Sequence, residues 1–157
     1  MSWKVNSGTI IKAIAVKIEP GKDLLECLVN IVNKLEVKTG VILSAVGSLE
    51  KCKLRNVKRF PSSFPIRRTD RLYSSIEGPL EILSLSGNIS QSETGKTIIH
   101  AHITVSYVKD KEIIVLGGHL IEGNMTYVMV EIFILDLDLK IYRKLHPLRK
   151  AMELHFT

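Results

Sequence analysis

The segment TIIHAHITVSYVKDKEIIVLGGH, residues 97–119, indicates the fold most directly. Residues 97–108 are rich in isoleucine, valine and threonine, which favour a long β-strand. Residues 110–111 predict a turn, and residues 112–116 predict a second, shorter strand that runs into Gly117-Gly118. The segment therefore predicts two adjacent strands of a sheet.

Three of the five histidines of the chain lie in this segment. His100 and His102 are two residues apart, so they share one face of the first strand. His119 follows the glycine pair, where the backbone can turn sharply. Three neutral imidazoles that converge from adjacent segments suit a borderline-soft divalent metal, with zinc the default. The sequence predicts a divalent-metal site, with zinc as the metal, at these histidines; a structural polar cluster is the alternative.

One helix is predicted before this segment. Apolar residues recur at helical spacing over residues 23–37, which is typical of an amphipathic helix. Asp23, with Glu26 three residues later, resembles a capping box at its start. Gly40 is expected to supply the left-handed residue that closes the helix.

The remaining apolar stretches predict further strands. Gly47-Ser48 and Gly78-Pro79 are expected to separate strands, and residues 60–70, with two prolines, are expected to form a loop. The predicted strands cover residues 10–18, 41–46, 49–57, 71–77, 80–89, 97–108, 112–116 and 125–137, and residues 140–145 are expected to pair with the last of them. One helix and about eight strands predict an α+β (α/β) fold, in which a mixed, largely antiparallel sheet packs with one main amphipathic helix.

The composition is that of an ordinary globular protein. The 157 residues fit one domain, residues 1–157, and 45% hydrophobic with 24% charged residues can form a core without disulfides. Cys27 and Cys52 stand outside any Cys-x-x-Cys motif and are expected to be reduced thiols. Neither a signal peptide nor a bilayer-spanning apolar run is evident, which predicts a soluble, cytoplasmic protein with no membrane partner.

The net charge of +6 is compatible with an anionic partner. Eight basic residues and one acid, Asp70, lie between positions 51 and 71. Such a surface can bind nucleic-acid phosphates without reading sequence, and nearby aromatic side chains can stack on bases. A solvated strand face and loop is the alternative. The candidate DNA-binding residues are Lys51, Lys53, Arg55, Arg67, Arg68 and Arg71.

Glu131 interrupts the apolar strand predicted at residues 125–137. A carboxylate in such a strand needs a partner for its charge. It is a candidate to orient a ligand imidazole or to act as a general base, and a salt bridge at a subunit interface is the alternative. The glycines do not form a phosphate-binding fingerprint, so a nucleotide-binding loop is not predicted.

Four short blocks together resemble the plants and prokaryotes conserved (PPC) domain, which is also found in plant AT-hook proteins. The blocks are residues 18–24 (IEPGKDL), residues 81–89 (EILSLSGNI), His100-Ala101-His102 and residues 117–120 (GGHL). The resemblance covers residue 9 to the C-terminus. It implies an α/β domain that assembles as a homotrimer, and a metal site at His100, His102 and His119. Plant members grip DNA through a separate Arg-Gly-Arg-Pro type segment, which this sequence lacks.

The leading hypothesis is a homotrimeric prokaryotic PPC-domain protein with a three-histidine divalent-metal site and non-specific DNA binding through its basic surface. The alternative is a metal-dependent enzyme, a lyase or hydrolase, that acts on a small anionic substrate with Glu131 assisting. A third hypothesis is an interaction module whose histidines are structural.

Overall fold

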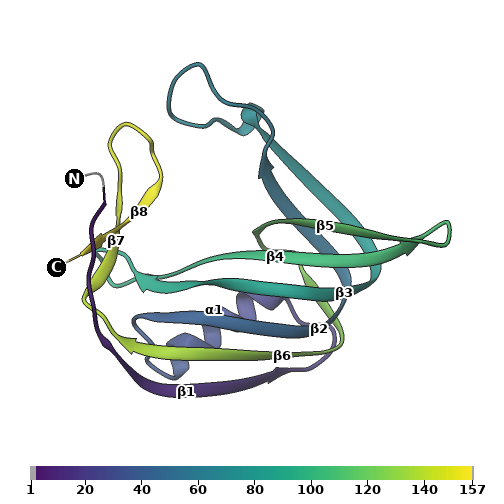
Figure 1. Ribbon diagram of the computed structural model, residues 1–157, viewed down its shortest axis with the longest axis horizontal. Coiled ribbons are helices and arrows are strands. Elements are labelled where there is room, and N and C mark those ends of the chain that lie inside the picture. Colours follow the sequence, from purple (N-terminus) through teal and green to yellow (C-terminus); the bar gives the residue numbers. More distant parts are fainter. Residues whose placement is uncertain (1–2, 157) are drawn as a thin grey trace.

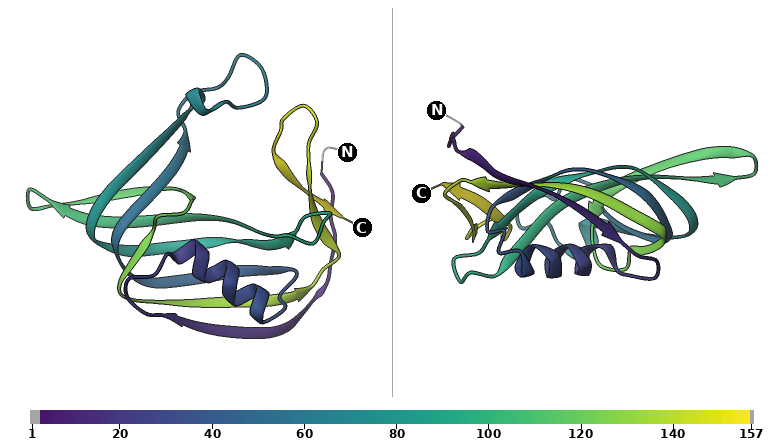
Figure 2. Two further views of the ribbon diagram at one scale, coloured as in Figure 1. Left: turned by 180° about the vertical axis from the view of Figure 1, so that it is seen from behind. Right: turned by 90° about the horizontal axis from the view of Figure 1, so that it is seen from below.

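A curved antiparallel sheet with one helix across one of its faces makes up most of the molecule (Figures 1 and 2). The computed structural model describes residues 3–156. The six-stranded sheet has the order β1-β6-β2-β3-β4-β5, and its neighbouring strands are antiparallel, so the predicted α+β class is confirmed. The elements are β1 Thr9–Ile18, α1 Leu24–Lys34, β2 Gly40–Val57, η1 Arg68–Asp70, β3 Arg71–Gln91, β4 Thr97–Lys109, β5 Glu112–Leu120, β6 Met125–Asp138, β7 Ile141–Leu145 and β8 Met152–Phe156.

Helix α1 starts where the sequence predicts it. A carboxylate oxygen of Asp23 accepts a hydrogen bond from the backbone N–H of Glu26 at 3.0 Å, so Asp23 is the N-cap. Leu24, Leu28 and Val32, which are spaced four residues apart, are fully buried. This apolar stripe fixes the face of the helix that covers the sheet.

The predicted end of the helix is wrong. Glu36, not Gly40, has the left-handed conformation, with φ of 56°, and Gly40 already begins β2. The backbone N–H of Glu36 donates to the carbonyl oxygen of Asn33 at 3.1 Å, and that of Val37 donates to the carbonyl oxygen of Val32 at 2.9 Å. These bonds satisfy the last helical carbonyls.

Two predicted turns lie inside continuous strands. At Gly47 the sequence predicts a turn, but β2 passes through it with a register shift against β6. A Cβ at Gly47 would lie 2.8 Å from the Cα of Val130, so the glycine permits close strand approach. Strand β3 likewise continues through the cis peptide bond Gly78-Pro79. Each of these two strands therefore replaces two predicted ones.

Strands β4 and β5 form a hairpin with a two-residue turn, as predicted. Asp110-Lys111 has φ values of 50° and 69°, as in the turns that match strand twist. Each residue of β4 pairs with the residue of β5 that lies equally far from this turn. His119 therefore lies opposite His102. Gly117-Gly118 continues β5 and pairs with β4, so the sharp turn expected there is absent.

The end of β5 returns to the edge of β2. Leu120 pairs with Leu54, and His119 pairs with Arg55. The fully buried Asn124 strengthens this closure, because its side chain accepts from the backbone N–H of Lys53 at 3.1 Å and donates to its carbonyl oxygen at 3.0 Å. The sheet therefore curls, and a residue of β2 lies beside the third histidine.

Residues 140–145 do not pair with β6, so that expectation is also wrong. Strand β7 pairs with β8 instead and forms a separate hairpin. Figure 1 shows this hairpin beside the chain ends, on the side opposite the β4–β5 tip. The buried Arg143 links it to β3, because its guanidinium donates to Ser90 Oγ at 3.1 Å and to Asn88 Oδ1 at 2.7 Å.

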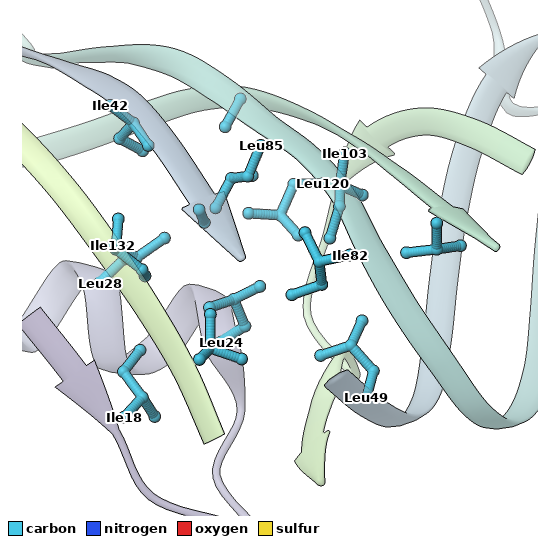
Figure 3. Packing of buried hydrophobic residues seen from close by; sticks show 14 of the residues in the cluster. Ile18, Leu24, Leu28, Ile42, Leu49, Ile82, Leu85, Ile103, Leu120 and Ile132 are labelled. Carbon is cyan, nitrogen blue, oxygen red and sulfur yellow. The ribbon is translucent and has the colours of Figure 1, made fainter. Parts of the chain in front are cut away.

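The core fills the space between α1 and the sheet. Figure 3 shows Leu24 and Leu28 of the helix pointing towards Ile18 and Ile132 of the strands. Burial of such side chains contributes about 1.5–3 kcal/mol each.

Cys27 is half-buried and Cys52 is buried, and both are free thiols. Among the described residues, no helix has the length and apolar character needed to cross a membrane.

The sheet face turned away from the helix is left uncovered. We call it the outer face and define it by Leu43, Val46, Leu83 and Phe133, each of which is more than half exposed. On β6 the neighbours Ile132 and Ile134 are fully buried on the helix side. Alternation along the strand therefore puts an apolar surface in solvent on the other side.

Candidate metal centre

The structure brings His100, His102 and His119 together on strands β4 and β5. His102 and His119 are register partners, and His100 lies two residues further along the same strand. Ala101 and Ile103 point into the core, so the histidines between and beside them point outward. The ring centroids are 5.1–5.5 Å apart, and one ring nitrogen of each lies within 4.8 Å of the others.

The surroundings favour the neutral form of the His119 and His100 imidazoles. Burial, followed by the positive charge of Arg55, lowers the pKa of His119 to about 4. Burial, and then the charge of Arg143, also lowers the pKa of His100. Neutral imidazole is the form that binds a metal, so the donor set fits a divalent ion at neutral pH.

Arg143 contacts the histidine cluster, and the sequence analysis did not predict this contact. Its Nη2 lies 3.3 Å from Nδ1 of His100, and a guanidinium can only donate. The Nδ1 lone pair of His100 therefore accepts this hydrogen bond. In a neutral ring the proton is then on Nε2. An ion that binds His100 must therefore displace Arg143 from Nδ1, or bind Nε2 in the other tautomer, which also loses this hydrogen bond. No spacing in the sequence connects β7 with β4, so only the fold could reveal this contact.

Arg55 and Arg71 stand beside the histidines. Both lower the pKa of His119, and a cavity of about 250 Å³ is lined by these two arginines together with His102 and His119. The sequence analysis assigned both arginines to a DNA-binding surface. Their side chains border the histidine cluster instead of forming a uniform solvent-exposed stripe.

The other basic residues between positions 51 and 71 fall into two groups, those with an acidic partner among the described residues and those without one. Lys51 pairs with Glu77 at 2.7 Å, and Arg59 pairs with the buried Asp70 at 2.8 Å. Lys53 is half-buried on β2. Arg67 and Arg68 remain exposed on the loop that leads into β3.

Glu131 is not brought to the histidines within one chain. It lies exposed on β6, on the same side as Phe133, and its register partners are Lys17 of β1 and Val46 of β2. Strands β2 and β3 separate β6 from β4. Adjacent strands lie about 4.8 Å apart, and β6 is three such spacings from β4. Glu131 is therefore too far from the cluster for contact.

Comparison with known sequences establishes the family. The sequence profile of the Plants and Prokaryotes Conserved domain matches residues 5–138. The chain belongs to this family. The chain is also similar to the bifunctional protein GlmU of two Synechococcus strains, with 30% identity over 146 residues. The match covers 92% of this chain and 20% of GlmU, so the chain spans about a fifth of the length of these relatives.

Solved structures share the fold over almost the whole chain. A metal-containing protein from Archaeoglobus fulgidus superposes with a TM-score of 0.76 at 25% identity, covering 98% of this chain and 99% of that one. A PPC protein from Pyrococcus horikoshii superposes with a TM-score of 0.75 at 26% identity, covering 98% and 100%. A protein from Bacteroides thetaiotaomicron for which DNA binding has been suggested reaches 0.73 at 22% identity, covering 96% and 99%, and shows the fold alone.

Proposed function

We propose that this PPC-domain chain is a single domain that holds one divalent metal ion, zinc, at His100, His102 and His119, and that it works in the cytoplasm as a homotrimer. The observation that carries the metal site is the convergence of three ring nitrogens within 4.8 Å. The metal-containing relative from Archaeoglobus fulgidus supports it.

A three-histidine zinc site leaves a fourth position for water or substrate, and zinc lowers the pKa of a bound water or polarises a carbonyl. The protein supplies the rest of the chemistry. Strands β4 and β5 hold the imidazoles on rigid elements. Arg55 and Arg71 give the surroundings a positive charge, which favours anionic ligands.

Metal analysis of protein purified without a histidine tag tests the proposal. We expect about one zinc per chain after exposure to equimolar zinc, iron and manganese, because imidazole ligands suit zinc. Protein that takes up no metal would refute the site and would favour the structural role of the histidines.

The outer face supports the homotrimer. Its apolar side chains lie on the neighbouring strands β6, β2 and β3 and are more than half exposed, and a large exposed apolar patch marks an interaction site. Burying this face between copies of the chain removes apolar area from water, at roughly 25 cal/mol per Å². The number of subunits, three, is what the resemblance to the PPC domain implies.

We expect light scattering to give a mass three times the 17.6 kDa of one chain. Phe133→Asp puts a charge into the packed outer face and is expected to lower the mass to that of one chain at micromolar concentration. Phe60→Asp is the matched control, because Phe60 is 99% exposed on a loop away from that face. A monomeric wild-type protein would contradict the proposal.

A second candidate function is non-specific DNA binding. The exposed Arg67 and Arg68 lie on a loop with Phe60 and Phe64, which are 99% and 48% exposed. Exposed guanidinium groups can contact phosphates and exposed rings can stack on bases. The surface is smaller than the sequence predicts, since Lys51 and Arg59 have acidic partners.

We expect a dissociation constant in the range of about 10⁻⁴ to 10⁻⁶ M at physiological salt, with little preference between AT-rich and GC-rich duplexes. The double variant Arg67→Glu/Arg68→Glu should weaken binding to all sequences about equally and flatten the salt dependence. Lys109→Glu/Lys111→Glu, at the distant β4–β5 turn, is the control with the same charge change. Tight, sequence-selective binding that survives high salt would contradict this function, as would unchanged binding by the first variant.

A further inference from the structure

A cavity beside the histidine cluster combines positive charge with an apolar wall. Its volume is about 250 Å³, and Arg55 and Arg71 line it together with His102 and His119. Arg55 reaches this place because β2 pairs with the end of β5, where it is the register partner of His119. The cavity is therefore built by the closure of the sheet and opens directly onto the proposed metal ligands.

The two arginines of this cavity lack acidic partners. Among residues 3–156, the structure gives neither Arg55 nor Arg71 an ion pair with a carboxylate. Arg59 and Arg149, by contrast, pair with Asp70 and Glu153. Both cavity arginines are half-buried, so water screens their charges less than it screens exposed ones.

The charges near the cluster are mutually repulsive. Burial, followed by the positive charge of Arg71, lowers the pKa of Arg55. Arg143 adds a third guanidinium beside His100. A divalent ion would add two more positive charges to the same place. An anion in the cavity would offset this repulsion, and no described side chain supplies one.

We propose that this cavity binds a small organic carboxylate, with Arg55 and Arg71 as its anion-binding residues. The proposal rests on the proposed metal function, because the carboxylate or a neighbouring oxygen of the same ligand would face the ion's open position. The planar fork of arginine matches a carboxylate with two parallel hydrogen bonds.

The apolar wall distinguishes an organic carboxylate from inorganic phosphate. Val57 and Ile66 form the apolar part of the lining, and Asn56 completes it. A short hydrocarbon tail gains from contact with such side chains, whereas phosphate would leave some of its oxygens facing them without donors. The cavity volume is smaller than that of sites for drug-sized molecules, so it suits a small ligand.

The test uses cobalt-loaded protein, whose visible spectrum reports changes in the metal's coordination. Propionate and inorganic phosphate are titrated separately into wild type, Arg55→Gln, Arg55→Lys and Arg71→Gln, after the metal content of each has been measured. We expect all four proteins to hold equal metal. Propionate should change the wild-type spectrum, and both glutamine variants should bind it at least about tenfold more weakly, since each loses a charged hydrogen-bond donor.

The controls distinguish binding at a specific subsite from a general effect of the protein's positive charge. Arg149→Gln removes the same charge from an exposed arginine on the β7–β8 side and should bind propionate like wild type. Arg55→Lys should bind more weakly than wild type, because lysine keeps the charge and loses the fork. Equal propionate binding by wild type and both glutamine variants would overturn the proposal, and so would a response to phosphate alone.

The outcome also separates this proposal from the metal site. If wild type takes up no metal, the proposed function fails, and the anion site is then judged on metal-free protein. In that case a propionate-dependent rise in melting temperature in wild type, absent in Arg55→Gln, would still support the subsite. No rise in wild type would overturn it as well.

Discussion

Replacing His102 with alanine is expected to lower zinc affinity by more than about 100-fold while leaving the fold intact. His102 is the register partner of His119 and shares a strand face with His100, so its loss leaves a site of only two imidazoles. Removing a partner that merely orients a ligand already costs about 10–100-fold, and removing a ligand costs more. The side chain is exposed, so alanine leaves no cavity in the core.

Elemental analysis measures the metal content of each protein. Thermal unfolding in the presence of a chelator measures whether the fold is intact. His146→Ala is the matched control, because His146 lies after β7, outside the cluster. It should keep the wild-type metal content. A variant with alanine at all three cluster positions that binds zinc like wild type would show that the site is wrong.

The same site should retain metal in mild acid. Protonation competes with metal binding, and unperturbed histidine titrates near pH 6.5. Because the pKa of His119 is lowered to about 4, the metal-free form of this residue stays neutral as the pH falls through 6 and 5. The pKa of His100 is lowered as well, so we expect half of the metal to be released at a pH below 6.5. A loss centred on pH 6.5 would contradict the structural environment of the cluster.

The local signals in the sequence predicted those features that depend on neighbouring residues. Asp23 caps the helix because its side chain needs only the first turn. The two-residue turn Asp110-Lys111 sets the hairpin register, and with it the contact between His102 and His119. The metal ligands could therefore be selected from spacing, because their meeting depends on one short turn.

Features that depend on distant strands could not be predicted in this way. A glycine marks either a reversal or a close approach, and at Gly47 only the position of β6 distinguishes the two. The arginines beside the histidines come from β2, β3 and β7, which meet β4 and β5 only after the sheet has curled. Arg143 in particular contacts His100 across 43 residues of sequence.

Replacing Gly87 with alanine is expected to destabilise the protein by about 2–3 kcal/mol and to disturb the metal centre at the same time. A Cβ at this position would lie 2.6 Å from both Cα and Cβ of Ala101, and it would also meet the carbonyl oxygen of His100. These atoms belong to the main chain of β4 or are fixed to it, so no flexible side chain can move aside. Overpacking of this kind costs about 1–3 kcal/mol, and here relief requires β3 and β4 to separate.

Gly87 pairs with Ala101, the residue between His100 and His102, so any separation moves two proposed ligands. Urea unfolding measures the stability, and the visible spectrum of cobalt-loaded protein measures the site. Gly117→Ala is the matched control on β5, because the nearest atoms to its added Cβ lie 3.2 Å away and include the end of the Thr104 side chain. It should cost little. If Gly87→Ala unfolds like wild type, the close approach of β3 to β4 is refuted; if it is destabilised but binds cobalt unchanged, the position of the histidines does not depend on this strand contact.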